Sequence, residues 1–300
     1  MKNKSTILGA ISVIAASILW GLDGVVLTPR LYNLDVVFVV FMLHMIPFVL
    51  MNIFLPGEYR TLKKFTVTDL VYFLLVAITG GFLGTYAIVK ALFLVNFQQL
   101  SVVVLLQKLQ PVFAIILASI LLKERIRKRF IIWASLAILA SYFLVFGAEA
   151  PTIDSQINIG LASLYALLAA FSFGSSTVFS KKILTKYSFS TATFYRYGLT
   201  AIILFFVVLS TGKLQHGFSD ISPTNWLFFF IIGITTGSGA IFLYYFGLVR
   251  IRAIVSAICE LFFPLSAIFF DYVINHRIIS PVQWVAAAIM IFAIFRISHK

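Results

Sequence analysis

Ten apolar segments of about 20 residues each follow one another along the chain, and they constrain its fold more than any other feature. A helix needs about 20 mostly apolar residues to cross the hydrocarbon core of a bilayer, whereas lipid-facing β-strands would alternate over about 10 residues. The sequence therefore predicts an all-α integral membrane protein with ten transmembrane helices. The predicted spans are Ile7–Leu27, Val36–Leu55, Leu70–Val89, Leu100–Leu122, Phe130–Gly147, Ile159–Ser180, Ser190–Leu209, Trp226–Val249, Ala253–Ile274 and Ile278–Phe295.

The composition agrees with a lipid bilayer as the main partner. Only 11% of the residues are charged, against about 25% in soluble domains. The net charge of +13 comes mostly from basic residues in short gaps between apolar segments, a pattern that favours membrane anchoring over nucleic-acid binding. The single Cys259 excludes an internal disulfide and a cysteine-rich metal site. We expect no metal and no cofactor.

The basic residues also predict the orientation of the chain. With the N-terminus in the cytoplasm, the inner segments contain 17 Lys and Arg residues, the outer segments contain 4, and 2 lie inside spans, which accounts for all 23. Loops on the cytoplasmic side of a membrane carry the excess of positive charge. The sequence therefore predicts a multi-pass protein of the cytoplasmic membrane with both termini in the cytoplasm.

The chain contains an internal repeat, which predicts one five-helix unit over residues 1–150 and a second over residues 151–300. An odd number of spans turns the second unit upside down in the membrane. Inverted repeats of this kind build transporters whose binding site lies near the midplane, between the halves. The matching pairs are Trp20-Gly21 with Phe173-Gly174 and Pro111 with Pro264, both 153 residues apart, and "AITGG" at Ala77–Gly81 with "GITTG" at Gly233–Gly237, 156 residues apart.

Two stretches carry a family resemblance. "LWG" at Leu19–Gly21 and "PVFAIILASILLKER" at Pro111–Arg125 resemble the EamA-type drug/metabolite transporters. The resemblance implies ten helices and secondary transport of small metabolites, but no particular substrate. In the second copy, Arg277 stands where the resemblance implies a glutamate.

The expected function is therefore secondary-active transport of a small metabolite or drug-like molecule across the cytoplasmic membrane by alternating access. Spans five and ten carry no charge before Arg296, which suits a role facing lipid or a second subunit, so a homodimer stays an open expectation. The alternatives are a non-transporting membrane scaffold, an ion channel and an intramembrane hydrolase. An ATP-driven pump is excluded, because the only Gly-Lys pair is not part of a phosphate-binding loop.

Polar side chains inside the spans are the candidate substrate-binding groups, because a charge at the bilayer centre costs at least about 2.5 kcal/mol and needs a cavity or a partner. Pro111 and Pro264 each remove a backbone hydrogen bond within a span, so they are the predicted helix breaks beside the site. Tyr86, Tyr195, Tyr197, Tyr244 and Tyr245 suit either lipid contact or stacking on a planar metabolite. The predicted substrate-binding residues are Asp23, His44, Gln107, Lys108, Gln110, Arg196 and Glu260.

Two ion pairs are plausible from depth alone. Arg196 and Glu260 both lie about 7 residues from the inner ends of their spans, roughly 10 Å deep at 1.5 Å per residue, and Asp23 and Lys108 form a looser match. Such pairs either only join helices or take part in transport, and the sequence leaves both roles open. For Asp23 we expect a place in an external vestibule, where it accepts a proton or contacts a cationic substrate group.

Overall fold

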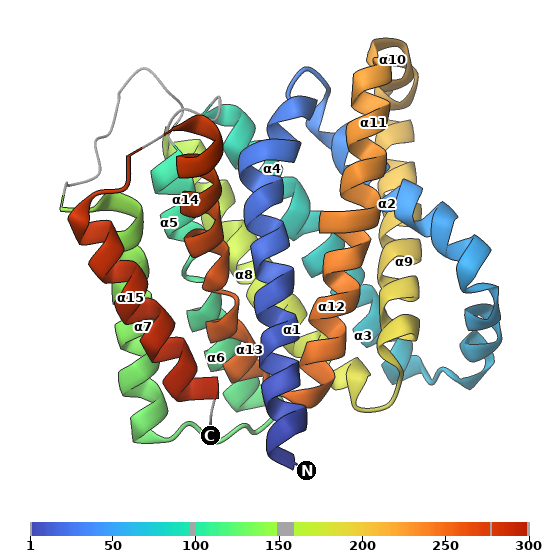
Figure 1. The fold of residues 1–300 in the computed structure, drawn as a ribbon. Coiled ribbons are helices and arrows are strands. Elements are labelled where there is room, and N and C mark those ends of the chain that lie inside the picture. Colours follow the sequence, from blue (N-terminus) through green and yellow to red (C-terminus); the bar gives the residue numbers. More distant parts are fainter. Residues whose placement is uncertain (1, 96–99, 149–158, 277, 299–300) are drawn as a thin grey trace.

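The computed structural model describes residues 2–95, 100–148, 159–276 and 278–298. Over these residues the regular structure is entirely helical, and the helices form one bundle (Figure 1). Nine of the helices found in this part of the chain are long and apolar enough to cross a membrane, and the apolar helix Leu105–Leu121 is shorter. With this shorter helix as part of span four, the predicted ten-helix membrane fold is confirmed.

Spans one to five are formed by α1 (Lys2–Leu22) with η1 (Asp23–Leu27) and η2 (Thr28–Leu31), α2 (Val36–Phe54), α3 (Val67–Val76) with η4 (Ala77–Leu83) and α4 (Gly84–Leu94), α5 (Leu100–Gln107) with α6 (Gln110–Leu121), and α7 (Lys128–Phe146). Spans six to ten are formed by α8 (Ile159–Leu184), α9 (Phe189–Ser210), α11 (Pro223–Ile232) with η5 (Gly233–Gly237) and α12 (Ser238–Arg250), α13 (Ala253–Cys259) with α14 (Phe262–Asn275), and α15 (Pro281–Ser298). The connections contain η3 (Pro56–Lys64) and α10 (Lys213–Asp220).

Side chains in the loops start several of these helices. The Asp35 carboxylate accepts a hydrogen bond of 2.9 Å from the Val37 amide at the start of α2. Thr66 and Asp69 form a reciprocal capping box on α3, and Ser222 and Asn225 form the equivalent on α11. Each such cap satisfies an amide that has no partner within the helix and contributes about 1 kcal/mol. The polar gaps between the apolar segments therefore fix where the spans begin.

The start of α1 and the end of α15 lie on the same face of the bundle, and the first helix of each repeat, α1 and α8, runs in the opposite direction to the other (Figure 1). This is the arrangement expected of two inverted five-helix repeats. The boundary between residues 150 and 151 and the unusual Arg277 both lie outside the described residues.

The aromatic-glycine pairs that revealed the repeat occupy equivalent contacts in the two halves. A Cβ on Gly21 of α1 would collide with the backbone of Ala267 in α14, and a Cβ on Gly174 of α8 would collide with the backbone of Gln110 and Ala114 at the start of α6. In each case the first helix of one repeat packs on the fourth span of the other. The glycines therefore allow the two halves to approach closely along both seams.

The segments "AITGG" and "GITTG" also adopt the same local structure. Both lie in π-helices, η4 and η5, in which the hydrogen bonds run to the fifth residue along the chain instead of the fourth. A third π-helix, η1, begins at Asp23. Single π turns inside α-helices occur frequently at functional sites, and they leave backbone carbonyls available to other groups.

Spans four and nine are each divided into two helices, whereas the sequence predicted an otherwise intact span with a helix break at its proline. Span four turns at Lys108-Leu109, between α5 and α6, and span nine turns at Glu260-Leu261, between α13 and α14. Pro111 and Pro264 follow these turns within the first three residues of α6 and α14. A proline at a helix start loses no hydrogen bond, because the first amides of a helix have no partner inside it. At each of the two predicted breaks, one helix therefore ends and a new helix begins after a two-residue turn.

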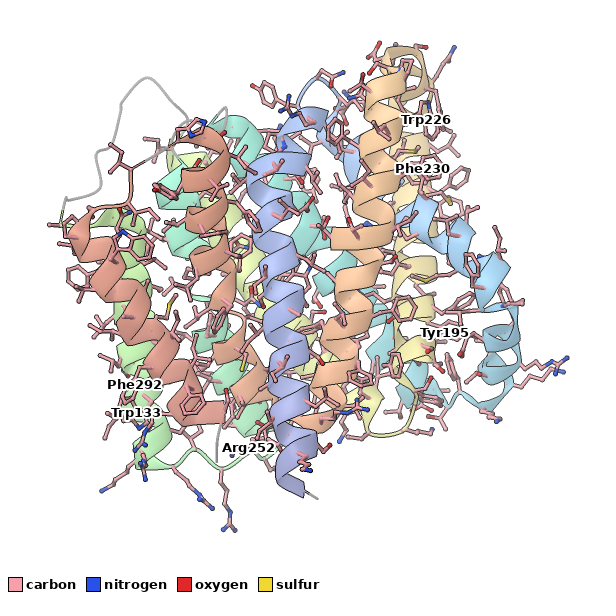
Figure 2. All side chains as sticks on the ribbon, viewed as in Figure 1. Trp133, Tyr195, Trp226, Phe230, Arg252 and Phe292 are labelled. Atoms are coloured by element: carbon pink, nitrogen blue, oxygen red, sulfur yellow. The ribbon has the colours of Figure 1, made fainter. Side chains whose placement is uncertain are left out.

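Spans five and ten pack against each other at the edge of the bundle. Trp133 of α7 and Phe292 of α15 lie edge to face, with ring centroids 5.4 Å apart, and Figure 2 shows them at the lower end of this helix pair. The labelled Arg252 lies at the same end of the molecule, and Trp226 and Phe230 lie at the opposite end. Aromatic and basic residues are typical of the two boundaries of a membrane.

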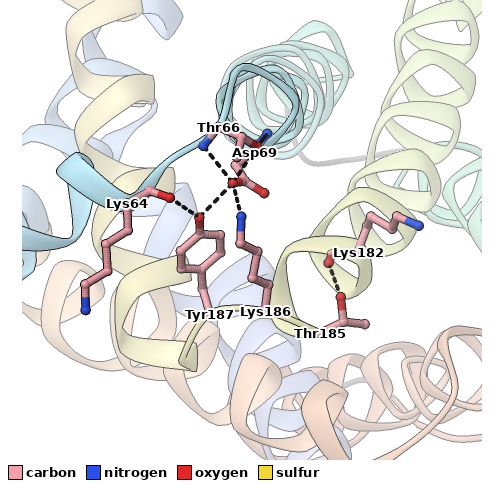
Figure 3. Close-up of polar contacts among 7 residues, drawn as sticks. All are labelled: Lys64, Thr66, Asp69, Lys182, Thr185, Lys186 and Tyr187. Atoms are coloured by element: carbon pink, nitrogen blue, oxygen red, sulfur yellow. Dashed lines mark hydrogen bonds and ion pairs between the residues drawn. The ribbon is translucent and has the colours of Figure 1, made fainter.

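Polar contacts join the two repeats on the face that carries the start of α1, the end of α15 and the basic loops. The Asp69 carboxylate of repeat one accepts hydrogen bonds from Lys186 and Tyr187 of repeat two (Figure 3). The hydrogen bond to Asp69 raises the pKa of Lys186, so this ammonium group stays charged at neutral pH. Glu124, just after α6, accepts hydrogen bonds of 2.9 and 3.1 Å from the first two amides of α13.

Candidate functional site

A cavity of about 210 Å³ lies between the two repeats. Eight spans contribute side chains to it, four from each repeat, and none of its described lining residues comes from α7 or α15. The cavity is lined by all seven predicted substrate-binding residues, Asp23, His44, Gln107, Lys108, Gln110, Arg196 and Glu260.

The two broken spans supply most of the polar lining. Gln107 ends α5, Lys108 lies in the turn, and Gln110 begins α6. Glu260 occupies the corresponding turn of span nine, at the 153-residue offset from Gln107. Discontinuous helices near the membrane midplane place polar side chains and free helix ends beside a binding site. The inverted repeat thus builds the same polar element into the cavity from both halves.

Glu260 is held by neutral donors from both repeats. Its carboxylate accepts hydrogen bonds from the amide group of Gln110 and, at 2.8 Å, from the hydroxyl of Tyr244. The Tyr244 hydroxyl also shares a hydrogen bond of 2.7 Å with the Thr177 hydroxyl. A carboxylate inside a membrane protein needs such partners to offset its loss of hydration.

The expected ion pair between Arg196 and Glu260 is not formed, which corrects the interpretation from depth. Arg196 donates instead to the carbonyl of Gly80 at 2.9 Å and to the hydroxyl of Tyr245 at 3.1 Å. The Gly80 carbonyl belongs to the π-helix η4, which frees carbonyls from the regular helical ladder. The guanidinium group therefore has neutral acceptors in a place where the sequence pattern indicated a carboxylate.

Asp23 and Lys108 do not pair either within the described part of the cavity. The Lys108 ammonium group lies 3.6 Å from the centroid of the Phe263 ring, and Glu260 is the nearby carboxylate that acts on it electrostatically. The hydroxyl groups of Thr28 and Thr236 lie beside the Asp23 carboxylate. The four charged residues line the same cavity, but their depth along the spans did not predict which of them are neighbours.

His44 lines the cavity on a face that also packs aromatic rings. Its Nδ1 lies 2.9 Å from the Val40 carbonyl of the preceding turn, and its ring lies 5.3 Å from the Tyr197 ring, measured between centroids. The rings of Trp20 and Tyr244, which also line the cavity, lie 5.4 Å apart, measured between centroids. The walls therefore contain both aromatic rings and polar groups.

Several cavity atoms have no hydrogen-bond partner although they are buried. Native proteins satisfy the great majority of buried polar groups, so a cluster of such atoms needs a specific explanation. Every buried side-chain atom without a partner in the described residues belongs to a residue that lines this cavity. These atoms are Asp23 Oδ1, Gln107 Oε1, Ser176 Oγ, Arg196 Nε and Thr236 Oγ1.

Sequence reasoning missed Ser176 and Thr236 as site residues. Neutral hydroxyl residues are common in membrane helices, where they can bond to their own backbone, as Thr177 does to the Phe173 carbonyl at 3.2 Å. The repeat carried a usable signal, because Ser176 stands 153 residues after Asp23. Among the five tyrosines suggested for stacking, Tyr197 and Tyr244 line the cavity.

A second cavity of about 190 Å³ adjoins the first and shares residues such as Gln107 and Phe263 with it. It continues past Pro264 to Asp271 and Gln283, at the ends of spans nine and ten that lie away from the basic loops. The central cavity therefore has a neighbouring space on the side opposite the basic loops.

Comparison with known proteins agrees with this architecture. The EamA-like transporter family matches residues 7–146 and, a second time, residues 160–299. A protein named riboflavin transporter ImpX, from Fusobacterium nucleatum, is 53% identical over 294 residues, which cover 97% of each chain. An uncharacterized transporter from Synechocystis sp., sll1164, is 28% identical over 177 residues, which cover 57% of this chain and 50% of that protein.

A crystal structure of another protein has the same fold, with a TM-score of 0.65 at 17% sequence identity, over 98% of this chain and 95% of that one. At this identity the likeness concerns the fold alone. The family match covers both repeats, and the resemblance seen in the sequence is confirmed. The chain therefore belongs to the EamA-like transporter family and is a multi-pass membrane protein that transports a small molecule.

Proposed function

We propose that the protein is a secondary-active transporter of riboflavin, or of a closely similar flavin, across the cell membrane, and that the molecule passes through it chemically unchanged. The name and 53% identity of the Fusobacterium relative support this substrate. The observation that carries the proposal is the cluster of unpartnered polar atoms in a cavity with aromatic walls. A flavin offers a planar ring for the aromatic side chains and hydroxyl, carbonyl and N–H groups for the polar atoms.

The proposed binding residues are the seven cavity residues predicted from the sequence, together with Ser176 and Thr236. In this proposal the units 1–150 and 151–300 move against each other around the cavity. The contacts of Asp69 and Glu124 with repeat two support a state that is closed toward the basic loops. A homodimer stays a prediction.

Uptake of labelled riboflavin into vesicles that contain the purified protein tests the function. We expect saturable uptake, absent from protein-free vesicles. Gln107→Leu removes an unpartnered acceptor of the cavity and should lower uptake by about 10-fold, whereas Gln215→Leu, in the exposed helix α10, should not change it. A current that does not saturate would indicate a channel, conversion of riboflavin would indicate an enzyme, and no uptake by the wild type would refute the proposal.

We also propose that both termini lie in the cytoplasm, because 17 basic residues lie in the segments on that side and 4 on the other. Single cysteines at Thr61, in η3, and at Gln215, in α10, test this in intact cells, since the native Cys259 is buried. A membrane-impermeant thiol reagent should label Gln215→Cys and not Thr61→Cys. The reverse pattern would mean that the protein is inserted the other way round.

A further inference from the structure

The charged side chains of the central cavity balance one another. Asp23 and Glu260 contribute two negative charges, and Lys108 and Arg196 contribute two positive charges, while the other described lining residues, His44 aside, carry no ionisable acid or base other than tyrosine. None of these groups forms an ion pair within 4 Å with another. The cavity therefore has separate charges of both signs and no formal excess of either.

The unpartnered atoms require hydrogen-bond donors from a ligand. Asp23 Oδ1 and Gln107 Oε1 are acceptors, and Arg196 Nε is a donor. The hydroxyl groups of Ser176 and Thr236 can do either. The Thr236 hydroxyl lies beside the Asp23 carboxylate and can donate to it, so a ligand that satisfies the rest of this set must bring at least one O–H or N–H group for Gln107 and an acceptor for Arg196 Nε. A phosphate group in place of a hydroxyl removes one such donor and adds only acceptors, so it cannot satisfy Gln107 Oε1.

Both cations of the cavity already contact protein groups. Both terminal nitrogens of Arg196 donate to protein groups, the Gly80 carbonyl and the Tyr245 hydroxyl. The ammonium group of Lys108 lies over the Phe263 ring and has Glu260 nearby. Phosphate recognition relies on free cationic donors directed at the same group. Arg196 Nε is one such donor, but the charges of Arg196 and Lys108 are balanced by the two carboxylates that line the same cavity.

We propose that the cavity selects an uncharged aromatic molecule that carries hydroxyl or N–H donors, and that it rejects the phosphate monoester of the same molecule. This inference rests on the proposed function, and it narrows the substrate to riboflavin rather than riboflavin 5′-phosphate. A phosphate monoester carries a charge of about −2 at neutral pH. It would leave the balanced cavity strongly negative in a region of low dielectric, beside the carboxylates of Asp23 and Glu260.

Competition against labelled riboflavin in the same vesicles tests the selectivity. With the wild type, unlabelled riboflavin should compete at least about 100-fold better than riboflavin 5′-phosphate, because an uncompensated buried charge is highly unfavourable. Equal competition by the two compounds would overturn the inference. If riboflavin itself is neither bound nor transported, the proposed function is wrong. The rejection of phosphate monoesters is then tested separately, by a thermal-shift comparison of uridine with its 5′-monophosphate. Stabilisation by uridine alone supports the inference, whereas stabilisation by the phosphate, or by neither compound, overturns it.

Two variants change the charge of the cavity in opposite directions. Asp23→Asn removes a negative charge and adds a donor, so the preference for riboflavin over its phosphate should fall by about 10-fold. Lys108→Met removes a positive charge and should increase the preference, which keeps the test available if one variant does not fold. Asp35→Asn is the matched control, because Asp35 caps α2 and pairs with Lys213 away from the cavity, and asparagine also caps helices. A preference that is the same in all four proteins would overturn the inference.

Discussion

Replacement of Glu260 by alanine should reduce riboflavin uptake by about 100-fold, since the loss of one partner from a buried charged network costs several kcal/mol. The variant leaves the Tyr244 hydroxyl and the Gln110 amide without their acceptor. It also removes the carboxylate near Lys108, which then remains as a buried cation without a counter-charge. Uptake by vesicles that contain equal amounts of folded protein measures the effect.

Glu260→Gln separates the shape of this side chain from its charge. The amide oxygen can still accept a hydrogen bond from Tyr244 or Gln110, so the loss of uptake should be smaller than for alanine. Asp35→Asn serves again as a carboxylate-to-amide change outside the cavity. Full uptake by the alanine variant, with unchanged thermal stability, would show that the Glu260 network has no part in transport.

Replacement of Gly174 by leucine should have the largest effect on stability. A Cβ at this position would come within 2.8 Å of the Gln110 carbonyl oxygen and 3.0 Å of the Ala114 amide nitrogen, both backbone atoms of α6. Backbone atoms cannot turn aside as a flexible side chain can, so α8 and α6 must separate. Overpacking of this kind costs about 3 kcal/mol, which lowers the melting temperature of a chain of this size by about 10 °C.

Gly160→Leu, on the same helix, is the matched control, because a Cβ on Gly160 has no neighbour within 4 Å. Thermal unfolding of both variants in the same detergent measures the difference. Equal melting temperatures would show that α6 and α8 are not in close contact at Gly174. Gly21 of α1 makes the equivalent contact with the backbone of α14. Gly21→Leu should therefore also lower the melting temperature.

The charged residues of the cavity could be predicted from the sequence, because burial in a membrane restricts where charged side chains can lie. Asp23, Lys108, Arg196 and Glu260 have few places in a bilayer other than a polar cavity, and the structure places all four in one. The prolines of the repeat likewise indicated the broken spans, and its glycines indicated the close contacts between the two halves. The backbone conformations that proline and glycine favour are the same in any surroundings.

The pairing of these charges could not be predicted, for a physical reason. Depth along a span follows from the count of residues, but the direction of a side chain around the helix axis depends on how neighbouring helices pack. The partners of Arg196 illustrate this, since the Gly80 carbonyl becomes an acceptor only through the π-helix η4. No residue pattern in "AITGG" alone distinguishes a π turn from an ordinary helical turn.

The central claim is that the unpartnered polar atoms between the two repeats bind the transported flavin. The most direct test is a structure of the protein in lipid nanodiscs with saturating riboflavin. The claim predicts the flavin inside the central cavity, with polar atoms within about 3.2 Å of several of the atoms that now lack partners, among them Asp23 Oδ1, Gln107 Oε1 and Ser176 Oγ. Riboflavin bound only outside this cavity, with those atoms still without partners, would contradict it.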